Sequence, residues 1–161
     1  MTTRQFLAAC AALVSSSAAA QRRPLPGAQT DNRRLPRDYT TPEPIQVPPA
    51  VLDSADVPWE QVQPGMRRKI YFSDRLTMVT IEFTREKPDA ARPAMHYHAH
   101  DQMAFVVEGR IRAFIGDQVK ELGPGGVYSL PSNVPHGIQV LTQKVVLIDV
   151  FTPPRDDMRR A

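Results

Sequence analysis

From residue 57 onward the chain consists of short runs rich in β-branched and aromatic residues, separated by turn-forming residues, and this pattern constrains the fold most strongly. We predict strands over 68–72, 77–83, 95–98, 103–108, 111–115, 119–122, 127–130, 137–141 and 145–151. Gly116-Asp117 predicts a two-residue hairpin turn. No stretch combines helical periodicity with capping residues. We therefore expect an all-β domain whose strands form the two sheets of a jelly roll.

Residues 1–20 have the organisation of a signal peptide. Arg4 supplies the positive charge, residues 6–14 form a short apolar segment, and Ala18-Ala19-Ala20 matches a cleavage site. The apolar segment is too short to cross a membrane. We expect a secreted or periplasmic protein that has no membrane association after cleavage. Cys10 lies in the leader, so the mature chain would contain no disulfide.

Residues 21–55 differ in composition from the rest of the chain. They contain the prolines Pro24, Pro26, Pro36, Pro42, Pro44, Pro48 and Pro49. Such a segment is expected to be an extended or disordered arm. Residues 56–161 remain as one domain, which is long enough to bury a core.

The net charge of +3 does not indicate a nucleic-acid partner. Residues 1–40 contain six arginines and two aspartates, so the rest of the chain sums to −1. The basic character therefore belongs to the leader and the arm. No aromatic residues alternate with these charges, as they do in single-strand binders, and we expect no nucleic acid to bind.

All four histidines lie between positions 96 and 136, and this clustering predicts a metal site. On an extended strand His96 and His98 share a face and lie about 6 to 7 Å apart, near enough to hold one ion. Gln102 and His136 can complete the ligand set. His100 has the same parity, but it lies at a turn and we expect it to be exposed. The alternative is a solvated strand face that binds no ion.

These two blocks resemble the two motifs of the cupin superfamily. The first contains H-x-H, and the second contains Gly126, Pro131, Asn133 and His136. Asn133 replaces a glycine of the family pattern, which asparagine tolerates because it adopts left-handed conformations readily. Gln102 stands where the family usually has glutamate. A neutral amide leaves the charge of the ion uncompensated, giving a stronger Lewis acid and a weaker metal trap.

The end of the chain resembles the pectin-degradation cupins of the KdgF type, which linearise unsaturated uronates. The pattern D-x-F-x3-R falls on Asp149, Phe151 and Arg155, and the resemblance extends from about residue 57 to 157. It implies catalytic roles for these three residues. It also implies a metal held by His96, His98, Gln102 and His136.

The three residues of this pattern could also have purely structural roles. Asp149 lies in an apolar run, where a carboxylate is costly without a partner or a task, but it could be a structural residue bonded to a backbone amide or to Arg155. Phe151 shares its face and could simply pack in the core. Arg155 follows two prolines and could be an ordinary surface residue.

The resemblance implies a small anionic sugar substrate, a 4,5-unsaturated uronate that opens and tautomerises to the linear 5-keto-4-deoxyuronate. The cofactor would be a divalent ion, and three imidazoles with an amide suit nickel, zinc, manganese or iron. Two alternatives stay open: a non-catalytic sugar- or metal-binding module, and a metal-dependent dioxygenase, which the missing carboxylate ligand disfavours.

Several predicted strands are apolar on both faces, whereas a solvated sheet face should alternate. Residues 104–107 and 145–150 show this pattern. We expect the additional apolar face to meet a second subunit in a homodimer.

Overall fold

The computed structural model describes residues 29–30 and 47–159. These residues form two sheets and two short 3-10 helices, η1 (Ser54–Asp56) and η2 (Asp156–Met158). The predicted signal peptide and most of the predicted arm lie outside the described residues. Among the described residues, no helix is long and apolar enough to span a membrane.

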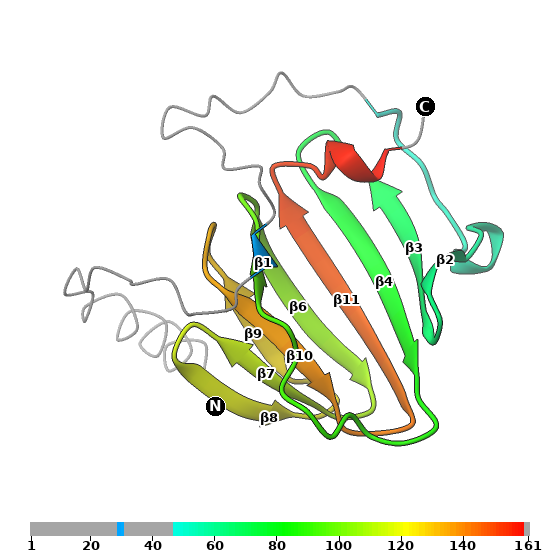
Figure 1. The fold of residues 1–161 in the computed structure, drawn as a ribbon. Coiled ribbons are helices and arrows are strands. Elements are labelled where there is room, and N and C mark those ends of the chain that lie inside the picture. Colours follow the sequence, from blue (N-terminus) through cyan, green and yellow to red (C-terminus); the bar gives the residue numbers. More distant parts are fainter. Residues whose placement is uncertain (1–28, 31–46, 160–161) are drawn as a thin grey trace, which may run out of the picture.

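The two sheets differ in size, and all but one of their strand pairs are antiparallel. The smaller sheet contains, in spatial order, β1 (Gln29–Thr30), β5 (His96–Tyr97), β10 (His136–Val140), β7 (Ile111–Ile115) and β8 (Gln118–Leu122). The larger contains β2 (Glu60–Gln63), β3 (Met66–Phe72), β4 (Thr77–Thr84), β11 (Lys144–Thr152), β6 (Asp101–Glu108) and β9 (Val127–Leu130). Figure 1 shows both sheets, with β3, β4, β11 and β6 side by side in the larger. The prediction of an all-β fold is confirmed.

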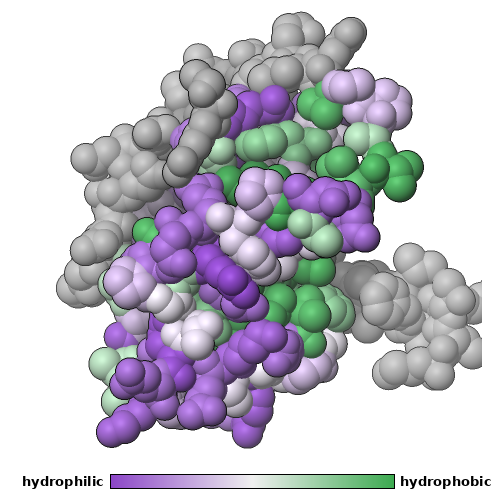
Figure 2. Space-filling view, turned by 90° about the vertical axis from the view of Figure 1, so that its right-hand side faces the viewer, coloured by the Kyte–Doolittle hydropathy of each residue, from purple (hydrophilic) through white to green (hydrophobic). Residues whose placement is uncertain are grey.

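All nine predicted strands are present, each within two residues of its predicted bounds. The predicted hairpin is also correct, since Gly116-Asp117 joins β7 and β8 and Gly116 has a φ of 55°. The sequence analysis missed β2 because its residues, E-Q-V-Q, are mostly polar. A polar edge strand discourages pairing with another chain. Hydrophilic side chains prevail on this side of the molecule, with smaller apolar areas between them (Figure 2).

The core lies between the sheets at one end of β11. Val145 and Leu147 on β11 have relative exposures of 0% and 1%, and they pack with Val106 and other buried apolar residues. Strand alternation places Asp149 and Phe151 on the same inner face, further along β11. The inner face of β11 therefore contributes residues both to the core and to the candidate site.

Candidate metal centre and active site

Residues of both sheets converge on a cavity that adjoins the core, and Phe83, Tyr128 and Leu147 belong to both. In the smaller sheet, His96 of β5 pairs in register with His136 of β10. In the larger sheet, Gln102 of β6 pairs with Phe151 of β11. His98 lies between β5 and β6, so the connection that joins the two sheets carries a histidine into the space between them.

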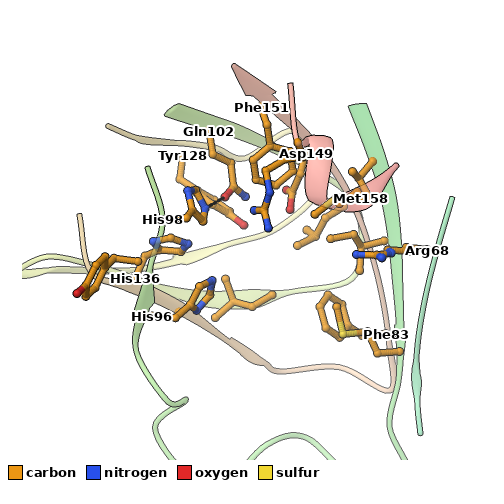
Figure 3. Close-up of a pocket in the computed structure, with 18 residues that line it drawn as sticks. Arg68, Phe83, His96, His98, Gln102, Tyr128, His136, Asp149, Phe151 and Met158 are labelled. Atoms are coloured by element: carbon orange, nitrogen blue, oxygen red, sulfur yellow. Dashed lines mark hydrogen bonds between the residues drawn. The ribbon is translucent and has the colours of Figure 1, made fainter. Parts of the chain in front are cut away.

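The three histidines His96, His98 and His136 form a cluster that could hold a metal ion. Each offers one ring nitrogen, and these nitrogens lie within 4.8 Å of one another. The ring centroids of His96 and His98 are 6.1 Å apart, in agreement with the predicted strand spacing. His136 lies 4.2 Å from His96 and 4.9 Å from His98 (Figure 3).

Backbone carbonyls fix the tautomers of two of these rings. Nδ1 of His98 lies 2.9 Å from the carbonyl oxygen of His100, and Nδ1 of His136 lies 2.8 Å from that of Val134. A carbonyl oxygen only accepts, so Nδ1 is the donor in both rings and Nε2 carries the lone pair. Such contacts orient metal-ligating histidines and set which nitrogen faces the ion.

Gln102 completes a donor set that suits a divalent ion. Its Oε1 lies 3.0 Å from Nε2 of His98. With the His98 tautomer given above, both atoms are acceptors, so neither donates to the other. Two ligands about 2.1 Å from one ion at right angles lie about 3.0 Å apart. The spacing therefore fits two adjacent positions around a bound ion.

Electrostatics keep His136 in the form that binds metal. Burial, together with the neighbouring His96, lowers the pKa of His136 from 6.5 to about 3. The ring is therefore neutral at ordinary pH, as a metal ligand must be.

His100 does not belong to this cluster, but it is half-buried. The prediction that its side chain is exposed is therefore wrong. Its ring centroid lies 5.8 Å from that of His98.

The turn that carries His136 is anchored to the first histidine block. Asn133 has a φ of 62°, in the left-handed region that its replacement of a glycine requires. Its backbone N–H donates to the carbonyl oxygen of His98 at a distance of 2.7 Å. The two histidine-bearing segments are therefore hydrogen-bonded to each other.

Asp149 is a buried acid without an ion-pair partner among the described residues. Its relative exposure is 5%, and its Oδ1 has no hydrogen-bond partner there. Burial raises the pKa of Asp149 from 3.8 to about 7, although a hydrogen bond from Gln102 lowers it. An acid with this pKa can both donate and accept a proton near neutral pH. The alternative of a pair with Arg155 is not observed, since Arg155 binds Asp157.

Phe151 lies between the histidines and Arg155. Its ring centroid is 5.6 Å from that of His98, and Cζ of Arg155 lies 5.3 Å from the same ring. The Arg155 guanidinium forms two hydrogen bonds with Asp157, of 2.9 and 2.8 Å. Its side chain is only 13% exposed, so it is not an ordinary surface arginine.

All seven predicted site residues line one cavity of about 270 Å³. Drug-sized ligands occupy pockets of roughly 300 to 1,000 Å³, so this cavity suits a smaller molecule. Among the residues of its wall that sequence reasoning missed are Arg68, Tyr97, Tyr128 and Met158. Only Arg68 gave a signal, because it shares strand parity with Ile70 and Phe72 and so places a charge on an apolar face.

Comparison with known proteins identifies the family. The profile of the cupin domain matches residues 83–151, which include all the metal-cluster histidines. The pectin degradation protein KdgF of Dickeya dadantii is 36% identical over 104 residues, covering 63% of this chain and 91% of KdgF. The chain belongs to the cupin family. The resemblance to cupins of the KdgF type is thereby confirmed.

Solved cupin structures support the same assignment. KdgF from Halomonas sp. has a TM-score of 0.62 and 30% sequence identity, with 70% of this chain and all of that chain covered. An RmlC-like cupin from Shewanella frigidimarina has a TM-score of 0.62, 28% identity, and coverage of 71% and 100%. Both of these chains are covered over their full length.

Proposed function

We propose that this cupin binds a divalent metal ion through His96, His98, Gln102 and His136 and isomerises a 4,5-unsaturated uronate. The observation that carries the proposal is the position of a buried acid, Asp149, beside a cluster of neutral nitrogen and oxygen donors in a cavity of monosaccharide size. The similarity to a pectin degradation protein supports this choice of substrate.

The charges of the cavity favour an anionic ligand. Three neutral imidazoles and a neutral amide leave the charge of a divalent ion uncompensated. Arg155 adds a guanidinium, which binds carboxylates well. A uronate supplies one negative charge and gains more electron density on oxygen as it reacts. The site therefore complements the reacting form better than the resting one.

The reaction is an isomerisation in which protons move between substrate atoms. The O1 hydroxyl loses its proton as the bond between C1 and the ring oxygen breaks, which gives an aldehyde at C1 and an enol at C5. C4 then takes up a proton, and the enol becomes a ketone. A divalent ion in the site would supply a Lewis acid that stabilises negative charge on substrate oxygens.

In this reaction each protein residue has a separate task. Asp149 accepts and returns the protons, for which a pKa of about 7 is well suited. Arg155 holds the substrate carboxylate. Phe151 shields the enol from water, because its ring lies between His98 and Arg155.

The test is to incubate the metal-loaded protein with unsaturated galacturonate and to follow the ultraviolet absorbance of the conjugated double bond. We expect the absorbance to fall. Asp149→Asn should slow the fall by about 100-fold or more, within the range for loss of a general acid or base. Asp117→Asn, in the exposed turn between β7 and β8, is the matched control and should leave the rate unchanged.

Other outcomes separate the alternatives. Constant absorbance together with tight sugar binding would indicate that the protein is a non-catalytic sugar-binding module. Consumption of oxygen would indicate a dioxygenase. A rate that is unaffected by complete removal of metal would contradict the proposed site.

We also propose that the protein is exported and dimeric. Export rests on the predicted signal peptide, residues 1–20, and places the reaction in the periplasm or outside the cell. The dimer rests on the outer face of the larger sheet, where Met103, Phe105, Val107 and Val127 are exposed by 55%, 43%, 42% and 51%. Contiguous exposed apolar residues commonly mark an interface, and a second copy would cover these.

A further inference from the structure

Arg68 places a positive charge on the wall of the cavity, and the proposed reaction gives it no task. Strand alternation on β3 turns its side chain inward. Figure 3 shows Arg68 on the opposite side of the cavity from His96 and His136. A ligand that reaches the histidines at one end would meet Arg68 at the other.

Glu60 holds the guanidinium of Arg68 along the edge formed by Nε and Nη2. Nε and Nη2 each donate to a carboxylate oxygen of Glu60 at 3.2 Å. No described residue accepts a hydrogen bond from Nη1, so the end formed by Nη1 and Nη2 can still receive a ligand. Arg155 has the same arrangement, with Asp157 on its Nε and Nη2. In both cases a carboxylate fixes the orientation of the guanidinium before any ligand binds.

Stability does not account for a charged pair at this place. The side chains of Arg68 and Glu60 are only 21% and 24% exposed, and the neighbouring wall contains the apolar Met66 and Phe83. Replacing a shielded ion pair by apolar residues is often neutral or stabilising. A binding role explains why the wall carries a guanidinium.

We infer that Arg68 is a specificity-determining residue, which holds the C2–C3 side of the sugar, where no bond changes in the proposed reaction. This inference rests on the proposed function. The reacting atoms C1, C4 and C5, with the ring oxygen and the carboxylate, lie toward the histidines, Asp149 and Arg155, and the hydroxyls on C2 and C3 extend toward Arg68. Two parallel N–H groups of a guanidinium match a pair of neighbouring oxygens, here the hydroxyls on C2 and C3.

The test compares a whole sugar acid with a fragment that lacks the far end. Galacturonate has six carbons, whereas pyruvate corresponds to C4 to C6 of the product. Dissociation constants are measured by calorimetry on the metal-loaded protein, with pyruvate also measured by competition. We expect Arg68→Met to weaken galacturonate binding by about 10- to 100-fold, as for loss of hydrogen bonds from a charged group, and to leave pyruvate binding unchanged.

Two variants serve as comparisons for this effect. Arg67→Met is the matched control: Arg67 adjoins Arg68 on β3 but points outward, where it pairs with Glu82 at 2.6 Å. It should change neither constant. Arg155→Met should weaken both ligands, because Arg155 holds the carboxylate that they share.

Arg68→Lys keeps the positive charge but loses the two parallel N–H groups, so it should weaken galacturonate binding less than Arg68→Met does. It also provides a reading if Arg68→Met does not fold, which thermal melting would detect.

An equal weakening of both ligands by the Arg68 variants would overturn the inference and make Arg68 a structural residue. Unchanged galacturonate binding, or failure of the unaltered protein to bind galacturonate, would overturn it as well. Turnover of unsaturated uronate is scored separately. If the Arg68 variants selectively weaken galacturonate binding but no turnover is observed, the proposed reaction is contradicted and Arg68 remains a sugar-binding residue.

Discussion

Asp149 and His136 lie in the same cavity, and burial acts on their charges in opposite directions. It raises the pKa of Asp149 to about 7 and, with the help of His96, lowers the pKa of His136 to about 3. Both shifts favour the neutral form. At neutral pH the site thus contains a neutral imidazole that can bind a metal ion and an acid that is partly protonated, which is the state that proton transfer requires.

These two shifts predict how the stability of the metal-free protein depends on pH. The folded state keeps a proton on Asp149 between pH 3.8 and about 7, where the unfolded chain has lost it. Asp149 therefore stabilises the fold below this window, and its contribution falls as the pH rises, by at most about 4 kcal/mol. His136 does the reverse: its contribution is present above 6.5 and is lost as the pH falls toward 3.

Asp149→Asn removes one of these opposing effects. Relative to the unaltered protein, its free energy of unfolding should rise between pH 4 and 7, by up to about 1.4 kcal/mol per pH unit. Urea unfolding at several pH values, after treatment with a chelator, measures this difference. Asp117→Asn should follow the unaltered protein. Parallel curves for Asp149→Asn would contradict the shifted pKa.

The strands explain why most of the site could be predicted from sequence. Strand parity placed His96 with His98 and Asp149 with Phe151, and these residues do face one cavity. Gln102 and His136 followed from motif positions. Strand parity put Arg68 on an apolar face but did not place it at the site, and Tyr128 gave no such signal, because a position on the wall depends on how the two sheets pack. The prediction for His100 was wrong for a different reason, because the conformation of the turn between β5 and β6 decides its burial.

The outer face of β6 carries the prediction of a dimer. Phe105→Glu should convert the dimer to a monomer, because a stable interface buries about 800 Å² on each partner and does not accept an unpaired charge. Sedimentation velocity measures the change. Val119→Glu is the matched control, since Val119 on β8 is 56% exposed but lies in the other sheet. A protein that stays monomeric at all concentrations, or a dimer that tolerates Phe105→Glu, would contradict the proposal.

At the scale of the whole molecule, the candidate ligands come from both sheets. His96 and His136 belong to the smaller sheet and Gln102 to the larger. An ion held by all of them would link the two sheets beside the core. The two-sheet architecture was predictable from strand spacing, whereas this division of ligands between sheets was not.

Metal should therefore stabilise the entire domain. At an ion concentration about a thousand times the dissociation constant, the gain is about 4 kcal/mol, or a rise in melting temperature of about 10 °C or more. Scanning calorimetry with and without chelator measures it. His136→Ala should abolish the rise, whereas His100→Ala, outside the cluster, should retain it. An equal response of both variants would indicate that the ion binds elsewhere.

The side chain of Gln102 contacts His98 through its oxygen and bonds to Asp149 as well. The amide group of Gln102 therefore contacts both the candidate ligand cluster and the candidate general acid, Asp149. A substitution of Gln102 that changes the affinity for the ion will also change the pKa of Asp149, so neither property can be adjusted alone. In the proposed mechanism, selection for a different ion would therefore also shift the pH at which the reaction runs.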